Sequence, residues 1–135
     1  MSKVSVTQVF PSTAASLWSA VGDPAGLPDW HPAIATSLLG ADGCSRVCTL
    51  ADGGEVREEI TARDDDARSY SYRIVESPLP LKNYRSRLRV SRTEGGASVT
   101  WESEFEAVGI PAADLEAMIR GLYEAGLGAL RASME

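Results

Sequence analysis

The sequence predicts an α+β domain in which an antiparallel sheet is followed by a long C-terminal helix. Three observations support this fold class. Between residues 34 and 108, short runs of alternating apolar and polar residues are separated by glycine, proline and aspartate, as in strands joined by turns. After residue 109 apolar residues recur with the period of a helix. One alternating run, residues 4–10, precedes a short helical segment.

The composition is that of one globular domain. The chain has 135 residues, of which 44% are hydrophobic and 24% charged, so we expect a single domain over residues 1–135. No apolar run approaches the roughly 20 residues that cross a bilayer, and the alternating start MSKVSVTQVF is not that of a signal peptide. We therefore expect a cytoplasmic protein without a membrane span. The net charge of −6 argues against nucleic acid as a partner.

The two cysteines, Cys44 and Cys48, are expected to be reduced thiols. On one strand they would lie about 13 Å apart, too far for a mutual disulfide. Two thiols and one distant histidine, His31, are too few ligands for zinc, so the sequence predicts no metal site. It also holds no phosphate loop and no dinucleotide-binding fingerprint, and we expect no cofactor.

Two short helical segments are expected after the first strand. The sequence PSTAASLWSAVGD, residues 11–23, predicts a helix capped by Ser12. It should end at Asp23, because the residue before a proline avoids helical dihedral angles. The next stretch, AGLPDWHPA, predicts a second short turn or helix.

Six further strands are expected, joined by the turns ADGG, DDDA, SPLPLKN and EGG; their ranges are 34–41, 45–50, 55–63, 68–76, 84–92 and 97–108. In the last hairpin a Gly95-Gly96 turn would place Arg89, Arg87 and Arg85 opposite Glu102, Glu104 and Glu106. All six side chains would then share the outer face. The three arginines therefore indicate a ladder of ion pairs, not a nucleic-acid stripe.

The middle hairpin should place a carboxylate on the inner face of the sheet. A loop at residues 65–67 pairs Glu59 with Arg73 outside. The inner face would then carry Val56, Glu58, Ile60, Tyr70, Tyr72 and Ile74. If ADGG forms a three-residue loop, Cys48 lies opposite Glu58 and Arg46 lies diagonal to it. A buried isolated carboxylate is costly, so Glu58 should be paired with Arg46 or protonated.

The last helix should begin at Ile110-Pro111, since proline suits the first helical turn. Its apolar stripe is expected to contain Leu115, Ile119, Leu122, Gly126, Ala129 and Leu130, flanked by Met118 and Tyr123. Gly126 and Ala129 are small residues in the middle of this stripe. They indicate either a close contact between helix and sheet or room left for a ligand.

The order of elements and several short motifs resemble the START-like (SRPBCC) superfamily, and within it the polyketide cyclase/dehydrase and lipid-transport group. The motifs are WHP after the second helix, DGG…REEI, YSYRI…PLPLKNY and VTWESEF. The resemblance covers nearly the whole chain. It implies a helix-grip fold, a curved antiparallel sheet wrapped around the long C-terminal helix with two short helices after strand 1, and a deep hydrophobic cavity between them. Members of the group bind lipids, hormones or polyketides, and some catalyse cyclisation or dehydration.

On this fold the inner faces would line the cavity. The expected lining is Tyr70, Tyr72, Tyr84, Leu88, Trp101 and Phe105 from the sheet, facing Leu122, Gly126 and Leu130 of the helix. The alternative is that these aromatic residues simply fill the core. The Glu58–Arg46 pair either organises the sheet or supplies an acid, base or polar anchor for a ligand, and both roles can hold.

His31 lies in the stretch GLPDWHPAI, which the resemblance places near the cavity mouth. There its imidazole would bond a ligand carbonyl or transfer a proton. In the alternative, Trp30 packs into the core and His31 bonds the backbone of its loop.

The leading hypothesis is therefore an internal site for a hydrophobic, polyketide- or lipid-like small molecule, with cofactor-independent cyclisation or dehydration of a polyketide-type substrate. Glu58, His31, Tyr72 and Tyr84 are the candidate catalytic residues. The candidate ligand-binding residues are Trp30, Arg46 and the cavity lining. The alternative is a non-catalytic carrier or sensor of a hydrophobic ligand, and a weaker one is a partner-binding module that uses the SPLPLKNY loop. We expect a monomer or a homodimer.

Overall fold

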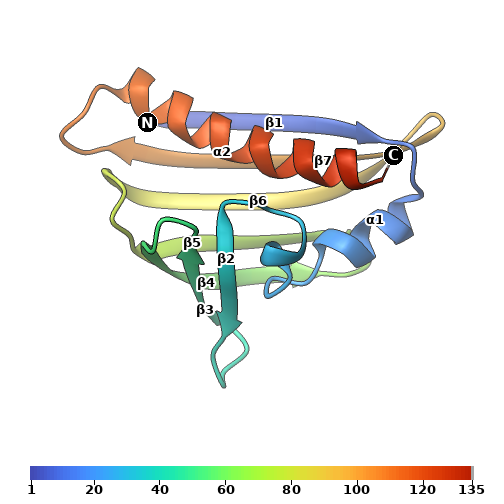
Figure 1. Ribbon diagram of the computed structural model, residues 1–135, viewed down its shortest axis with the longest axis horizontal. Coiled ribbons are helices and arrows are strands. Elements are labelled where there is room, and N and C mark those ends of the chain that lie inside the picture. Colours follow the sequence, from blue (N-terminus) through green and yellow to red (C-terminus); the bar gives the residue numbers. More distant parts are fainter. Residues whose placement is uncertain (135) are drawn as a thin grey trace.

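The computed structural model describes residues 1–134 and confirms the α+β helix-grip fold (Figure 1). Its elements are β1 (Ser2–Phe10), α1 (Ala14–Val21), the 3-10 helix η1 (Leu27–Asp29), β2 (Ile34–Leu39), β3 (Ser45–Leu50), β4 (Glu55–Asp64), β5 (Ser69–Glu76), β6 (Leu81–Thr93), β7 (Gly96–Ala107) and α2 (Ala112–Ser133). The strands form one antiparallel sheet in the order β1-β7-β6-β5-β4-β3-β2. The first and last strands of the chain are therefore neighbours.

Helix α2 runs along β1 and β7 and covers the inner face of the sheet, while α1 lies near one end (Figure 1). Two hydrogen bonds tie α2 to β1. The Arg120 guanidinium donates to the Ser5 carbonyl at 3.2 Å, and the Ser2 hydroxyl donates to the Glu116 carboxylate at 2.7 Å. Within residues 1–134 there is no helix long and apolar enough to cross a membrane.

Thr13, rather than the expected Ser12, caps α1. The Thr13 Oγ1 atom accepts a hydrogen bond from the Ser16 amide at 3.1 Å, so the prediction was wrong by one residue. The Ser12 hydroxyl is turned away and lies 3.5 Å from the Met134 sulfur at the end of α2. The Trp18 indole N–H donates to the Asp65 carboxylate at 3.1 Å, which leaves this indole at the edge of the core.

The β6–β7 hairpin turns one residue earlier than expected. The turn is Glu94-Gly95, with Gly95 at φ +83, and Gly96 already pairs with Thr93. A Cβ atom on Gly96 would lie 2.2 Å from the Phe10 carbonyl oxygen, so Gly96 is required by its close approach to the end of β1. Moving the turn by one residue shifts the strand register by two, which leaves every side chain on its predicted face.

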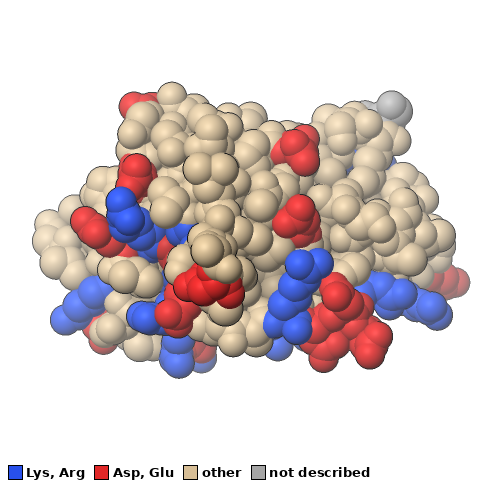
Figure 2. Space-filling view, turned by 90° about the horizontal axis from the view of Figure 1, so that it is seen from below, with Lys and Arg blue, Asp and Glu red and all other residues tan. Residues whose placement is uncertain are grey.

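The outer face of the sheet carries the expected ladder of ion pairs with this corrected register. Arg87 pairs with Glu102, and Arg85 pairs with Glu104 at 3.4 Å. Glu106 pairs instead with Lys82 at 3.6 Å. Basic and acidic side chains lie side by side on the face shown in Figure 2. Such exposed pairs contribute little to stability individually, because water screens them.

The middle strands bear out the predicted inner and outer faces. Glu59 lies opposite Arg73 on the outer face with an ion pair of 3.0 Å, and Ile60 lies opposite Tyr72 on the inner face. Residues 51–54 connect β3 to β4, and the Leu50 amide donates to the Gly54 carbonyl at 2.7 Å, which sets the register of this hairpin. Arg46 is consequently directly opposite Glu58, and the expected pairing of Cys48 with Glu58 across the strands was wrong.

The buried stripe of α2 differs from the expected one. Its buried residues are Leu115, Ile119, Tyr123, Gly126, Leu127 and Leu130, whereas Leu122 and Ala129 are only half-buried. Residues four apart form a ridge along a helix, and here that ridge contains Tyr123 and Leu127. The helix is thus turned slightly about its axis relative to our prediction, which brings the Tyr123 ring into the core.

Candidate ligand-binding site

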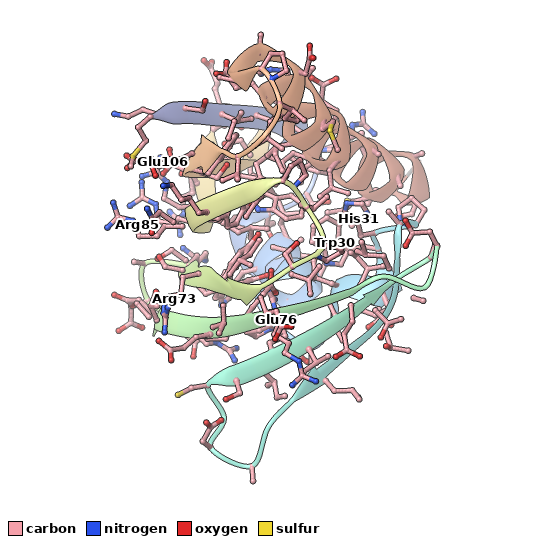
Figure 3. All side chains as sticks on the ribbon, turned by 90° about the vertical axis from the view of Figure 1, so that its left-hand side faces the viewer. Trp30, His31, Arg73, Glu76, Arg85 and Glu106 are labelled. Atoms are coloured by element: carbon pink, nitrogen blue, oxygen red, sulfur yellow. The ribbon has the colours of Figure 1, made fainter. Side chains whose placement is uncertain are left out.

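Trp30 and His31 enter the space between α2 and the sheet from the loop that follows η1 (Figure 3). The Leu27 carbonyl accepts hydrogen bonds from both of their amides, at 3.2 and 2.8 Å, which holds the loop in a tight turn. Proline occupies the first part of this turn and also follows His31, so the backbone is stiff on both sides of the pair. Both side chains are buried, His31 to 1% exposure.

Both ring nitrogens of His31 are occupied by backbone groups. The Nδ1 atom accepts a hydrogen bond from the Ala33 amide at 3.1 Å. The proton of the neutral ring is therefore on Nε2, which donates to the Leu122 carbonyl of α2 at 2.9 Å. Burial lowers the pKa of His31 and favours this neutral form. In this structure neither nitrogen is left for a ligand, as the alternative interpretation of the loop anticipated.

Gly126 is a close-contact glycine. A Cβ atom at this position would lie 2.3 Å from Cδ2 of the His31 ring, a distance that any other residue would have to relieve by moving the ring or the helix. Of the two explanations open from the sequence, the structure therefore supports close packing at Gly126 and not space for a ligand. The neighbour is the imidazole of the loop, which the sequence pattern of α2 alone does not indicate.

Aromatic rings fill the centre of the interior. The Trp101 indole stacks on the Tyr123 ring with centroids 4.2 Å apart. Trp30 and His31 meet the same indole edge-on, at 5.7 and 5.8 Å. The hollow expected between Tyr72, Trp101 and Gly126 is thus occupied by side chains. Leu88, Phe105 and Leu130 are buried as predicted. The Leu122 side chain is only half-buried, and this residue takes part in the cluster through its carbonyl oxygen, which bonds His31.

The buried hydroxyl groups of Tyr72, Tyr84, Tyr123 and Ser86 are connected by hydrogen bonds. The Trp101 indole N–H lies 3.1 Å from the Tyr72 oxygen, which lies 3.3 Å from that of Tyr84. Tyr84 contacts the Tyr123 hydroxyl, which lies 3.4 Å from Ser86. The Ser86 hydroxyl donates to the Glu102 backbone carbonyl at 2.9 Å. Since each hydroxyl has one proton, this order satisfies every donor of the group. The Trp101 N–H also lies 3.1 Å from the Ser86 oxygen, so the hydrogen bonds close into a ring.

Arg46 and Glu58 form a buried ion pair next to these hydroxyl groups. The Arg46 Nε atom donates to Glu58 Oε1 at 2.7 Å, and the side chains are 0% and 8% exposed. The Arg46 guanidinium lies over the Tyr72 ring, 4.6 Å from its centroid, and also contacts Tyr70. The Cys48 thiol donates to the same Glu58 oxygen at 3.5 Å. The inward carboxylate therefore has the partner that the sequence predicted.

Burial governs the protonation of this cluster. It raises the pKa of Glu58, an effect that the positive charge of Arg46 opposes. Burial and the neighbouring Glu58 raise the pKa of Cys48 to about 11. Burial also raises the pKa of Tyr70, Tyr72 and Tyr84, so these phenols remain neutral. Within residues 1–134, Glu58 Oε2 accepts no hydrogen bond.

Strands β5 and β6 diverge beside this cluster. They pair as far as Arg73 and Arg85, after which Ile74 pairs only with Glu58 on β4. A depression of about 610 Å³ lies at this gap, lined among others by Ile74 and Tyr84 from the inner side. Arg73, Glu76 and Arg85 stand at its rim (Figure 3). A depression of about 840 Å³ lies among the charged residues of the outer ladder and involves none of the Trp30, His31 or Arg46 side chains.

Tyr123 and Ser86 are central to the cluster but were not among the predicted site residues. Tyr123 supplies both the ring that stacks on Trp101 and a hydroxyl of the cluster. A signal for it was present, because positions 115, 119, 123 and 127 are all apolar or aromatic and repeat every four residues. Ser86 lies on the inner face of β6, where a small hydroxyl among apolar neighbours indicates a buried hydrogen bond.

A family model described as "Polyketide cyclase / dehydrase and lipid transport" matches residues 1–135. The protein XoxI from Bacillus cereus is 29% identical, with a TM-score of 0.96 over 99% of this chain and 96% of that chain. An uncharacterised protein from Bacillus thuringiensis is 27% identical, with a TM-score of 0.95 over 98% of both chains. A START superfamily protein from Mycobacterium smegmatis shares the fold at 15% identity, with a TM-score of 0.81 over 98% of this chain and 96% of that chain. Comparison with curated protein sequences found no match.

Proposed function

Because this chain belongs to the polyketide cyclase / dehydrase and lipid transport family, we propose that it binds a hydrophobic small molecule between the inner face of the sheet and α2. The observation that carries the proposal is the Arg46–Glu58 pair buried beside the chain of hydroxyl groups. A buried ion pair is often no better for stability than apolar residues of the same size. A largely apolar interior with a few polar groups is, however, the usual form of a small-molecule site.

Binding in this interior requires side chains to move, because rings occupy its centre. The gap between β5 and β6 supports a route inward, since Ile74 and the buried Tyr84 line it and Glu58 is the neighbour of Ile74 across the sheet. The ligand would replace ring-to-ring contacts of Trp30 and Trp101 with contacts of its own. Replacing one set of apolar contacts by another changes the free energy of binding little. The polar groups, Arg46 and Glu58, therefore decide which ligand binds.

The three tryptophans provide an internal test. Trp30 and Trp101 are buried at the site, whereas the Trp18 indole bonds Asp65 near the surface. We expect the amphiphilic probe 1-anilinonaphthalene-8-sulfonate to bind saturably and to shift the indole N–H resonances of Trp30 and Trp101 in a ¹H–¹⁵N correlation spectrum, with that of Trp18 unchanged. Absence of saturable binding, or a shift confined to Trp18, would contradict the proposal. Native mass spectrometry of the protein from its own cells would then identify the physiological ligand.

The second candidate function is cofactor-independent cyclisation or dehydration of a polyketide-type substrate. It is favoured by Glu58, whose Oε2 atom accepts no hydrogen bond from the described residues and whose pKa burial raises. Its carboxylate would remove the α-proton of a β-keto group, and the resulting enolate carbon would attack a ketone of the same chain. The new alkoxide takes the proton back, and loss of water completes the dehydration. Confinement in the interior supplies the positioning.

Conversion of 2,4,6-heptanetrione to orcinol, which releases one water, separates this enzyme from a carrier. We expect Glu58→Gln to abolish any acceleration of this reaction while the probe of the previous test still binds. His31 is a weaker candidate for proton transfer, since backbone groups hold both of its nitrogens. Tyr72 and Tyr84 remain candidates for polarising a carbonyl. A protein that binds the probe but does not accelerate the reaction is the carrier or sensor of our alternative.

A further inference from the structure

The loop of residues 26–33 places Trp30 and His31 between α2 and β7 (Figure 3). Both rings pack edge-on against the Trp101 indole, with centroids 5.7 and 5.8 Å away. His31 joins the loop to α2 through its hydrogen bond to the Leu122 carbonyl at 2.9 Å. The Trp30 Nε1 atom has no hydrogen-bond partner among residues 1–134, so packing holds this ring in place. The two rings are therefore among those that must move before a ligand enters the interior.

The position of His31 suits only its neutral ring. The Nδ1 atom accepts the Ala33 amide proton at 3.1 Å, so a proton on Nδ1 would bring two N–H groups face to face. The ring already lies against the backbone of α2, since a Cβ atom at Gly126 would be only 2.3 Å from its Cδ2 atom. A protonated His31 can therefore relieve this conflict only by moving away from α2, and the loop moves with it.

No carboxylate is paired with the His31 ring among the residues that the structure describes. The titratable side chains on the elements around it are Asp23 and Asp29 of the loop, Tyr123 and Glu124 of α2, Arg46 of β3 and Glu58 of β4. The three acids of the loop and α2 are exposed, and Glu58 is bonded to Arg46. Burial raises the pKa of Tyr123, so this phenol is neutral. A protonated His31 would thus be a buried charge without a partner, which is costly.

We propose that this loop is an acid-released gate: the neutral His31 ring fastens it to α2, and protonation of His31 releases it and opens the interior to the ligand. The inference rests on the proposed function and adds the regulation of its site. Trp30 moves with His31, because the two residues are neighbours in a loop that Pro28 and Pro32 stiffen. Its unpaired N–H gains water as a partner when the loop opens, which favours release.

The size of the effect follows from the titration of the released ring. A released His31 takes up a proton with the ordinary pKa of 6.5, whereas burial lowers the pKa of the closed ring and keeps it neutral. The ratio of open to closed molecules should then rise about tenfold from about pH 7.5 to about pH 5.5. The observed rate of ligand entry should rise by the same factor, as long as most molecules are closed.

Amide hydrogen exchange measures the opening itself. The His31 amide donates to the Leu27 carbonyl and the Ala33 amide donates to His31 Nδ1, so both report the closed loop. Their opening constants, corrected for the intrinsic exchange rate at each pH, should rise about tenfold from about pH 7.5 to about pH 5.5. His31→Gln, whose side chain does not titrate in this range, should show no such rise. Amides of the β6–β7 hairpin should be better protected at both pH values, which identifies the opening as local.

Entry into the site is measured by stopped-flow association of 1-anilinonaphthalene-8-sulfonate, whose sulfonate keeps its charge at both pH values. The association rate constant should rise about tenfold more in the wild type than in His31→Gln when the pH is lowered from about 7.5 to about 5.5. The variant is the matched control, because every other titrating group of the protein is the same in both.

The outcomes separate the gate from the proposed function. If the probe binds at neither pH, the proposed function itself is wrong. If the probe binds but the wild type and His31→Gln respond equally to pH, the interior binds ligands and the gate is wrong. The gate is also wrong if the Ala33 amide is as well protected as the hairpin, because the loop then opens only on full unfolding. Should His31→Gln fail to fold, a loop opening constant that is equal at both pH values in the wild type still overturns the gate.

Discussion

His31 and Leu122 join the N-terminal loop to the C-terminal helix through one buried hydrogen bond. The Nε2–H group of the imidazole donates to the Leu122 carbonyl, a backbone group of α2, at 2.9 Å. The ring reaches it only because position 126 has no side chain. The same loop places Trp30 in the interior. The position of the candidate site therefore depends on a contact between residues 91 positions apart.

This contact predicts a pH dependence of stability. The pKa of His31 is lowered in the folded state by burial, so the unfolded chain binds a proton more readily around the ordinary value of 6.5. Stability from the neutral ring is complete above that value and is lost as the pH falls toward the folded pKa. Urea unfolding at about pH 7.5 and about pH 5.5 should show a larger loss in the wild type than in His31→Gln. An equal loss in both proteins would show that other groups carry the pH dependence.

Two glycines of α2 should respond to alanine in opposite ways. Gly126→Ala places a methyl group against the His31 ring and should destabilise the fold by about 1–3 kcal/mol. Gly128→Ala is the matched control, because its Cβ would meet nothing within 4 Å. It should stabilise the helix by about 0.5–1 kcal/mol. Thermal unfolding followed by circular dichroism measures both, and a neutral Gly126→Ala would mean that the loop and α2 are not in close contact.

Breaking the buried ion pair should cost far more than breaking an exposed one. Arg46→Met leaves Glu58 buried without its partner and should lower the free energy of unfolding by about 3–5 kcal/mol. Arg73→Met, which removes the partner of Glu59 on the outer face, is the control and should change it much less. Adding Glu58→Met to Arg46→Met should restore most of the lost stability. Failure of this rescue would point to Arg46 contacts other than the ion pair.

The four tyrosines of the chain should resist ionisation as long as the protein is folded. Burial raises the pKa of Tyr70, Tyr72, Tyr84 and Tyr123 above the ordinary value of 10. Their contribution to stability is present below that value and is lost as the pH rises above it, since the unfolded chain then releases protons first. Absorbance at the tyrosinate band should therefore rise together with unfolding, in one step. A separate, earlier rise would show that at least one hydroxyl is open to water.

Much of the sheet could be predicted because its information is local. Alternation assigned Glu59 and Arg73 to the outer face and Tyr72 to the inner face, and the structure confirms these positions. The register of the β6–β7 hairpin was wrong by two residues, since a Gly-Gly pair permits more than one turn. The contact with β1 determines which turn forms, because the Phe10 carbonyl lies too close to Gly96 for any side chain at that position. That approach is a contact between distant segments, which a turn sequence does not contain.

The sequence by itself determined the fold class, the faces of the strands and the inward direction of Arg46 and Glu58, because periodicity of apolar residues dictates which side of an element is buried. Only the tertiary structure decided how the interior is filled. Helix α2 is oriented so that Tyr123 stacks on Trp101, and the absence of a side chain at Gly126 leaves space for the His31 ring. The tertiary structure also leaves Trp30 Nε1 and Arg46 Nη2 without acceptors in the described chain. Packing and hydrogen-bond partners depend on several elements at once, so no single stretch of sequence specifies them.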